Sequence, residues 1–158
     1  MKNFSRVSAS MLVFAALSGT ALAANLAWPT TGVVEIGSSA RALFSTLEPS
    51  GLVWHSGINQ LMLVGDEGQV IAMNADGTNA TLWTVSGTDL EDITVVDPNS
   101  SYVYLADENG QIIKYNLATS SITQKWSVTE WMPEITCKSG SSTCGMEALT
   151  YADGYFYA

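Results

Sequence analysis

The sequence predicts an all-β protein, a β-propeller fragment with about two and a half four-stranded blades. The first observation is an internal repeat, because Glu48–Asn74 and Gly87–Asn116 are two versions of one stretch set about 42 residues apart. The second is that each copy holds four short apolar runs separated by turn residues, the pattern of strands joined by hairpins. Four antiparallel strands repeating every 40–45 residues or so is the spacing of propeller blades. A β-sandwich, the alternative, does not usually repeat its sequence so closely.

The repeat defines the blade boundaries. Gln60–Asn74 aligns with Tyr102–Asn116, which sets Asn74 over Asn116, and Leu52 aligns with Ile93 in the preceding strand. A third copy begins where Glu147 matches Glu91. The two full blades are expected at residues 51–86 and 91–128. An insertion at 129–145 follows, and an incomplete third blade occupies 147–158.

Short apolar runs give the strands of the first blade. The middle runs are almost continuously apolar, as expected for strands buried on both faces between neighbouring blades. Four tryptophans are expected to pack between blades: Trp54, Trp83, Trp126 and Trp131. The four runs expected as strands are Gly51–Trp54, Leu61–Val64, Gln69–Met73 and Ala80–Val85.

Residues 24–50 form a segment before the first blade. Within it, Gly32–Ile36 is suited to be a closing strand paired with the last blade of a complete ring, and Ala40–Leu47 to be a short helix. A propeller needs at least about four blades, and six or seven are more common. We therefore expect the sequence to be part of a longer propeller.

Residues 1–23 have the three-part pattern of a secretory signal peptide. Lys2 and Arg6 precede the apolar run Met11–Leu17, and an A-x-A cleavage site ends at Ala23. The alternatives are an amphipathic first helix and a membrane span, but the run is shorter than the roughly 20 residues that cross a bilayer. We expect cleavage after Ala23 and a periplasmic or extracellular protein.

The remaining chain is strongly acidic. Loss of Lys2 and Arg6 leaves four basic residues against fifteen acidic ones, a formal charge of −11. Such a surface repels nucleic acid and anionic membranes and attracts cations. The expected partner is a small molecule or a protein rather than a nucleic acid, and the mature chain has no apolar stretch long enough to span a membrane.

Cys137 and Cys144, the two cysteines of the chain, lie in a Gly/Ser-rich stretch of the insertion. In an oxidising compartment such a pair is expected to form a disulfide. A metal site would need more ligands, and the chain has one histidine, His55.

Glu91 and Glu147 are the candidate metal ligands. Each stands at the start of a blade's first strand, the strand that lines a propeller channel, and Glu48 lies two residues before the equivalent position, Ser50. Carboxylates that converge on a channel repel one another unless a cation lies between them, and Ca²⁺ takes about six to eight oxygen ligands. The alternative is that these glutamates accept hydrogen bonds from backbone amides, while the neighbouring Asp92 either joins the site or caps a strand.

The other polar residues have structural interpretations. Acidic residues in the hairpins suit turns for backbone reasons, and a lone histidine after the first strand is expected to be solvated. No catalytic serine elbow, zinc-binding helix motif or phosphate loop is present. The hairpin acids are Asp66, Glu67, Asp107 and Glu108.

The three blade openers, "EPSGLVW", "DLEDITVV" and "GMEALTY", together with the hairpin "LVGDEGQVIAMNADG", resemble the SdiA-regulated family of bacterial secreted propellers. That family is similar in style to NHL-repeat and phytase-like esterase propellers. The resemblance implies a six-bladed extracytoplasmic propeller that holds calcium. The openers Glu91-Asp92 and Glu147-Ala148 depart from the Glu-Gly common in such families.

Three functions are compatible with the sequence. The first is a non-enzymatic binding or scaffold module. The second, which the phytase-like resemblance implies, is a calcium-dependent ester hydrolase, and the third is a surface or adhesion module. A phosphate substrate would need basic groups, and no Lys or Arg lies in a blade opener.

The cysteine pair gives a first testable prediction. Cys137 and Cys144 should have Cα atoms roughly 4.4–6.8 Å apart, within bridging distance. Mass spectrometry of the native secreted protein should therefore detect no alkylated thiol, and reduction should make both cysteines reactive. Two reactive thiols before reduction would contradict the disulfide.

Overall fold

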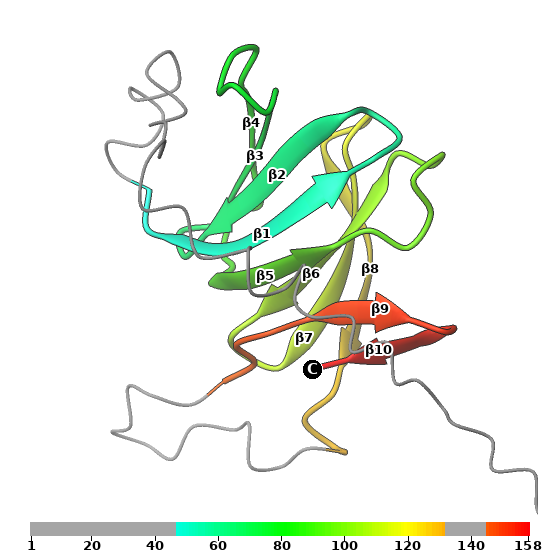
Figure 1. Ribbon diagram of the computed structural model, residues 1–158. Coiled ribbons are helices and arrows are strands. Elements are labelled where there is room, and N and C mark those ends of the chain that lie inside the picture. The colour runs from blue at the N-terminus through cyan, green and yellow to red at the C-terminus, as the bar shows by residue number, and fades with distance from the viewer. Residues whose placement is uncertain (1–46, 132–144) are drawn as a thin grey trace, which may run out of the picture. The chain divides into compact units, whose positions relative to one another are not determined.

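A computed structural model describes residues 47–131 and 145–158, which form ten antiparallel strands and no helix (Figure 1). Two four-stranded sheets, each with its strands in chain order, are followed by a hairpin. The first sheet comprises β1 (Pro49–His55), β2 (Gln60–Gly65), β3 (Gln69–Met73) and β4 (Thr81–Thr84). The second comprises β5 (Leu90–Thr94), β6 (Tyr102–Asp107), β7 (Gln111–Asn116) and β8 (Ser121–Ser127). The hairpin comprises β9 (Thr150–Ala152) and β10 (Tyr155–Tyr157).

The two sheets are repeats in structure as well as in sequence. Leu52 pairs with Leu63 in the first sheet, and Ile93 pairs with Leu105 at the equivalent place in the second. The predicted alignment of Leu52 with Ile93 is therefore confirmed. The turn between the second and third strands is also shared, since Gly68 and Gly110 both have a positive φ, 78° and 74°, which suits glycine.

Apolar packing joins the sheets face to face. Consecutive residues of β2 are buried on opposite faces, so the prediction of middle strands covered on both sides is confirmed. Figure 1 shows β1 beside β5, and β5 also contacts β9. This is the arrangement of successive β-propeller blades, so we call the two sheets blade 1 and blade 2. The buried residues of their shared core are Met62, Val64, Val70, Ala72, Val85, Leu90, Ile93, Val103, Leu105, Ile113 and Tyr115.

The hairpin β9–β10 packs on the other face of blade 2, where a third blade is predicted to begin. Ala106, Ile112 and Val128 of blade 2 form a core with Met146 and Leu149. The ring centroids of Tyr104 and Phe156 lie 5.0 Å apart. Such tilted aromatic pairs add to the stability that burial provides.

Two of the four predicted inter-blade tryptophans pack as expected. Trp83 and Trp126 lie against the two inter-blade cores. Trp54 and Trp131 remain 44% and 76% exposed among the described residues, so their packing between blades stays a prediction. Trp54 points from the face of β1 that blade 2 does not cover, and Trp131 lies after β8 ends.

Several predicted features lie outside the described residues. These are the leader (1–23), the closing strand Gly32–Ile36, nearly all of the short helix Ala40–Leu47, and both cysteines, Cys137 and Cys144. They stay predictions. Within the part of the chain that the structure describes, nothing forms a helix of the length and hydrophobicity needed to cross a membrane.

The blade interface generates a stability prediction with a matched control. Ile113→Ala removes a fully buried side chain from the core between blades 1 and 2. We expect it to lower the free energy of unfolding by about 2–5 kcal/mol, because it leaves a cavity. Ile122→Ala, in the neighbouring strand β8 at a position 38% exposed, should cost less than about 1 kcal/mol. Urea denaturation measures both, and equal losses would contradict the inter-blade core.

Candidate metal site

A β-bulge places one polar residue at the start of each blade's first strand. In blade 1 the pairing with β2 shifts between Pro49 and Gly51, so Ser50 is the extra residue. In blade 2 the shift falls between Leu90 and Asp92, so Glu91 is the extra residue. Bulges commonly redirect a side chain near functional sites. The repeat therefore presents Ser50 and Glu91 from the same backbone geometry.

Main-chain hydrogen bonds bring these strand starts against the hairpin turns. The Leu90 amide donates to the Asp66 carbonyl in the blade 1 turn, with N and O 3.3 Å apart. At the next interface the Met146 amide donates to the Glu108 carbonyl over 3.4 Å. Within blade 2, the Glu108 amide donates to the Asp89 carbonyl over 2.8 Å. The same bonding pattern thus gathers acidic residues at one end of the blades.

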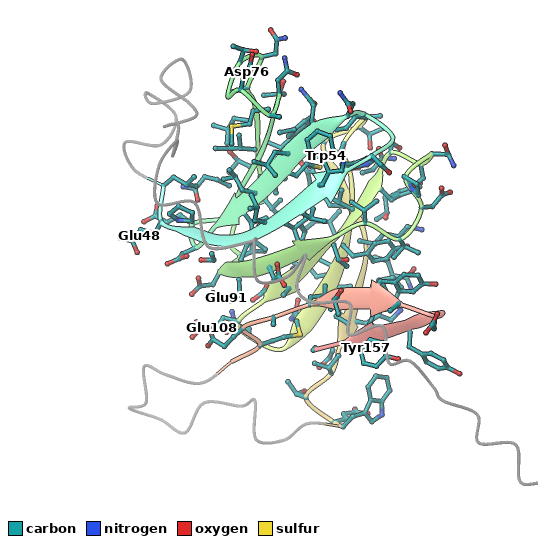
Figure 2. All side chains as sticks on the ribbon, viewed as in Figure 1. Glu48, Trp54, Asp76, Glu91, Glu108 and Tyr157 are labelled. Atoms are coloured by element: carbon teal, nitrogen blue, oxygen red, sulfur yellow. The ribbon has the colours of Figure 1, made fainter. Side chains whose placement is uncertain are left out.

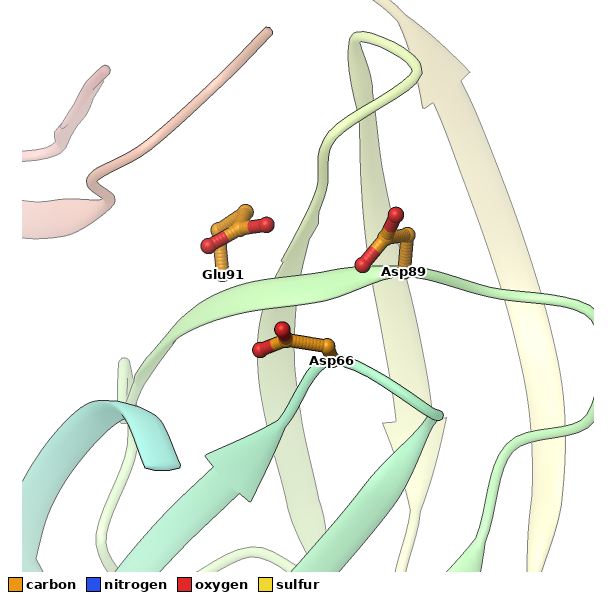
Figure 3. Close-up of side chains that lie close together, drawn as sticks. All are labelled: Asp66, Asp89 and Glu91. Carbon is orange, nitrogen blue, oxygen red and sulfur yellow. The ribbon is translucent and has the colours of Figure 1, made fainter. Parts of the chain in front are cut away.

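Three carboxylates converge at the interface between blades 1 and 2 (Figure 3). Asp66 lies in the turn after β2, Asp89 immediately precedes β5, and Glu91 occupies the β5 bulge. One carboxylate oxygen from each residue lies within 4.8 Å of the others, and all three residues are half-buried. The Ser50 hydroxyl also donates a hydrogen bond to Asp66. We call Asp66, Asp89 and Glu91 the acidic triad.

The triad has an unfavourable electrostatic environment. Burial, and then the nearby negative charges of Glu147, Asp66, Asp89 and Glu108, raise the pKa of Glu91 from 4.5 to about 7. All of these charged neighbours are acidic. Near neutral pH, Glu91 is therefore divided between its protonated and ionised forms.

Glu108 extends the acidic environment toward the third unit. A hydrogen bond with the Asp89 side chain, then burial, then the charges of Asp89, Glu147 and Asp107 raise the pKa of Glu108. Figure 2 shows Glu91 and Glu108 at the same end of the blades, with Asp76 on a distant turn. Gly145 takes the place that Asp89 has one blade earlier, and a Cβ there would collide with the Glu108 side chain. The second interface consequently lacks one of the three carboxylates.

The structure rearranges the predicted set of ligands. Of the two predicted ligands, Glu91 belongs to the triad, whereas Glu147 is exposed and lies close enough to raise the pKa of Glu91 without being part of the triad. Asp66, which the sequence suggested as a turn former, and Asp89, which it did not suggest, complete the cluster. The repeat does mark both residues. Asp66 aligns with Glu108 and Asp89 aligns with Glu48, so each of these positions is acidic in both copies.

Asp92 has a structural role in the described region. Its Oδ1 accepts a hydrogen bond from the Ile93 amide over 2.8 Å, and its Oδ2 accepts one from the Leu149 amide over 2.7 Å. It therefore ties blade 2 to the third unit. Its counterpart in blade 1 is Gly51, where a Cβ would collide with the Asp92 main chain, so a small residue allows the two inner strands to approach.

Comparisons with known proteins add little to this geometry. No protein-family profile and no curated protein match the chain. Among solved structures, a chain of the "Crystal structure of Nidogen/Laminin Complex" is similar, with 18% identity and a TM-score of 0.45. The similarity covers 52% of this chain and 32% of that one, so the match spans about a third of its length.

The raised pKa of Glu91 generates a prediction on pH dependence. The folded protein holds the Glu91 proton more tightly than the unfolded chain does, so this group favours folding below pH 4.5 and loses that contribution as the pH rises to about 7. As the pH rises from 4.5 to 8, the free energy of unfolding of Glu91→Gln should therefore increase by about 1–2 kcal/mol relative to that of the wild type. This is less than the full pKa shift implies, because water screens a half-buried group.

Urea denaturation at the two pH values measures this difference. Glu67→Gln is the matched control, since Glu67 is an exposed residue in the same turn as Asp66. It should leave the pH dependence unchanged. A Glu91→Gln variant whose stability follows the wild type at both pH values would contradict the assignment.

Proposed function

We propose that the protein is an extracytoplasmic β-propeller module that binds calcium at the acidic triad and serves as a binding or scaffold module. The convergence of Asp66, Asp89 and Glu91 carboxylate oxygens within 4.8 Å is the observation that carries this proposal. Secretion rests on the predicted leader, and membership of the SdiA-regulated family rests on the blade openers. Both are part of the proposal.

The chemistry of the triad favours a hard divalent cation. All its side-chain donors are carboxylate oxygens, which suit Ca²⁺, whereas zinc sites usually include His or Cys. Each of the charged groups that raise the pKa of Glu91 is negative, so a cation would relieve repulsion. Binding would also displace the proton that Glu91 partly retains at neutral pH, and calcium affinity should therefore rise with pH.

The position of the triad supports a structural role for the ion. Asp66 belongs to blade 1, while Asp89 and Glu91 belong to the start of blade 2. An ion held by all three would link the turn of one blade to the first strand of the next. It would reinforce the contact that the Leu90–Asp66 main-chain hydrogen bond already makes.

The ester hydrolase alternative has weaker support. An anionic ester needs basic groups beside the metal, and no basic group contributes to the pKa shifts of Glu91 or Glu108. Among the described residues, Lys114 instead lies over the Tyr102 ring, with Nζ 4.1 Å from the centroid. Calcium-dependent phosphate release from an inositol phosphate would favour the hydrolase.

The strongly acidic composition supports a protein or small-molecule partner over nucleic acid.

Calcium binding generates a prediction on thermal stability. A ligand that binds only the folded state raises the melting temperature, and calcium at about 100 times its Kd should add about 2.7 kcal/mol. Glu91→Gln and Asp66→Asn should both reduce this calcium-dependent shift. Without calcium, Glu91→Gln should melt at the same temperature as the wild type or higher, because it removes repulsion.

Asp76→Asn is the control for loss of a carboxylate. Asp76 is exposed in the turn between β3 and β4, where it accepts hydrogen bonds from Thr78. The variant should therefore have a lower melting temperature than the wild type, but calcium should raise that temperature by the same amount. Calorimetry with and without calcium measures all four proteins. A wild type that does not respond to calcium would overturn the metal site.

A further inference from the structure

His55, the one histidine of the chain, is fully buried at the end of β1. The expectation of a solvated histidine was therefore wrong, because residues 95–101, the loop between β5 and β6 of blade 2, cover it. We call these residues the covering loop. Gly57 of the β1–β2 turn lies against the main chain of Pro98 in this loop, and a Cβ on Gly57 would lie 3.3 Å from His55 Cε1. The turn and the covering loop thus enclose the imidazole ring at the interface between blades.

The enclosed ring has no polar partner. Neither ring nitrogen of His55 has a hydrogen-bond partner among the described groups, and both nitrogens are shielded from solvent. A neutral imidazole has one N–H donor, whereas an imidazolium has two donors and a positive charge. A buried charge without a partner costs much more free energy than a buried neutral polar group. The closed site therefore favours the neutral form of His55.

No acidic side chain among the described residues compensates for a positive charge on the ring. The covering loop contains one titratable residue, Asp97, which is exposed and accepts a hydrogen bond from the Asn99 amide over 2.9 Å. The β1–β2 turn, residues 56–59, contains none. The other residues around the adjoining pocket, from β2, β4, the covering loop and the segment after β7, are not titratable either. Burial therefore lowers the pKa of His55 below 6.5, and the main chain of His55 itself opposes this shift only in part.

We propose that protonation of His55 moves the covering loop away from the β1–β2 turn, so that acid loosens one end of the contact between blades 1 and 2. A proton reaches the ring nitrogens only when the loop opens, because the closed structure shields both of them. The open form therefore binds the proton more tightly than the closed form does. The closed form has its full stability above pH 6.5 and loses stability as the pH falls below that value.

This response differs from that of the acidic triad in place and in sign. His55 lies at the C-terminal end of β1, whereas the triad adjoins the N-terminal end through Asp66, whose amide donates to the Glu48 carbonyl over 3.4 Å. Acid favours the folded state at Glu91, whose pKa is raised, and disfavours the closed loop at His55, whose pKa is lowered. A measurement of local opening at the covering loop therefore distinguishes the two groups.

NMR of the full chain gives the first test, because the signals of a single histidine ring need no assignment. We expect the His55 ring to titrate with a midpoint below pH 6.5 in the wild type. Gly57→Ala introduces a Cβ that collides with the Pro98 main chain, so it should separate the turn from the loop and bring the midpoint closer to 6.5. A wild-type midpoint at or above 6.5 would overturn the proposal, whether or not the variant folds.

Amide hydrogen exchange measures the opening itself. The reporter is the Leu117 amide, which donates to the Ser101 carbonyl of the covering loop over 2.8 Å. After correction for the intrinsic exchange rate, its opening equilibrium constant should rise by up to about tenfold from pH 7.5 to pH 5.5 in the wild type. Glu91→Gln should retain this rise, because the triad is not involved.

His55→Leu is the matched variant for the exchange experiment. Leucine is similar in size to histidine but has no group that titrates, and an apolar side chain suits a site without polar partners. The variant should therefore show no rise in opening between pH 7.5 and pH 5.5. Circular dichroism verifies that it is folded. Equal rises in the wild type and in His55→Leu would contradict the assignment to His55.

Discussion

The apolar contact between blades 1 and 2 is the interaction on which the rest of the structure depends. Each sheet is apolar on both faces, so neither is stable alone, and stacking buries both inner faces. Stacking also places the first strands of successive blades side by side, where acidic residues must approach one another. The electrostatic cost at Glu91 is at most about 3–4 kcal/mol before screening by water. Burial of two core side chains offsets it, since each contributes about 1.5–3 kcal/mol.

Much of the fold could be predicted from the sequence because its determinants are local. Apolar runs of four to six residues between Gly, Asn and Asp turns mark the strands, and the repeat reveals which strands are equivalent. The start of the third unit could be placed as well, because Glu147 repeats Glu91, and β9 and β10 lie within residues 147–158. The exposure of single side chains such as Trp54 depends on which element covers each face of the sheet, and the repeat alone does not predict that.

The candidate site could be predicted only in part, because it forms across two blades. Glu91 was identifiable since it opens a strand. Asp66 joins it only through the bulge and the hydrogen bond from the Leu90 amide to the Asp66 carbonyl, and neither leaves a local pattern in the sequence. His55 was expected to be solvated but is buried, for the same reason: the loop around Pro98 that covers it comes from the next blade. Sequence periodicity predicts where strands lie, whereas the acidic triad and the surroundings of His55 both form at the interface between blades.

The shared bulge separates the chemistry of the blades from their fold. Within one chain the same backbone carries serine in blade 1 and glutamate in blade 2, with identical pairing on either side. Substitution at this position therefore changes the charge at one end of the propeller while strand register is preserved. A change of length there would instead turn the flanking side chains to the opposite face of the sheet. Duplicated blades that share this geometry can thus diverge one residue at a time, each acquiring its own ligand chemistry on a common framework.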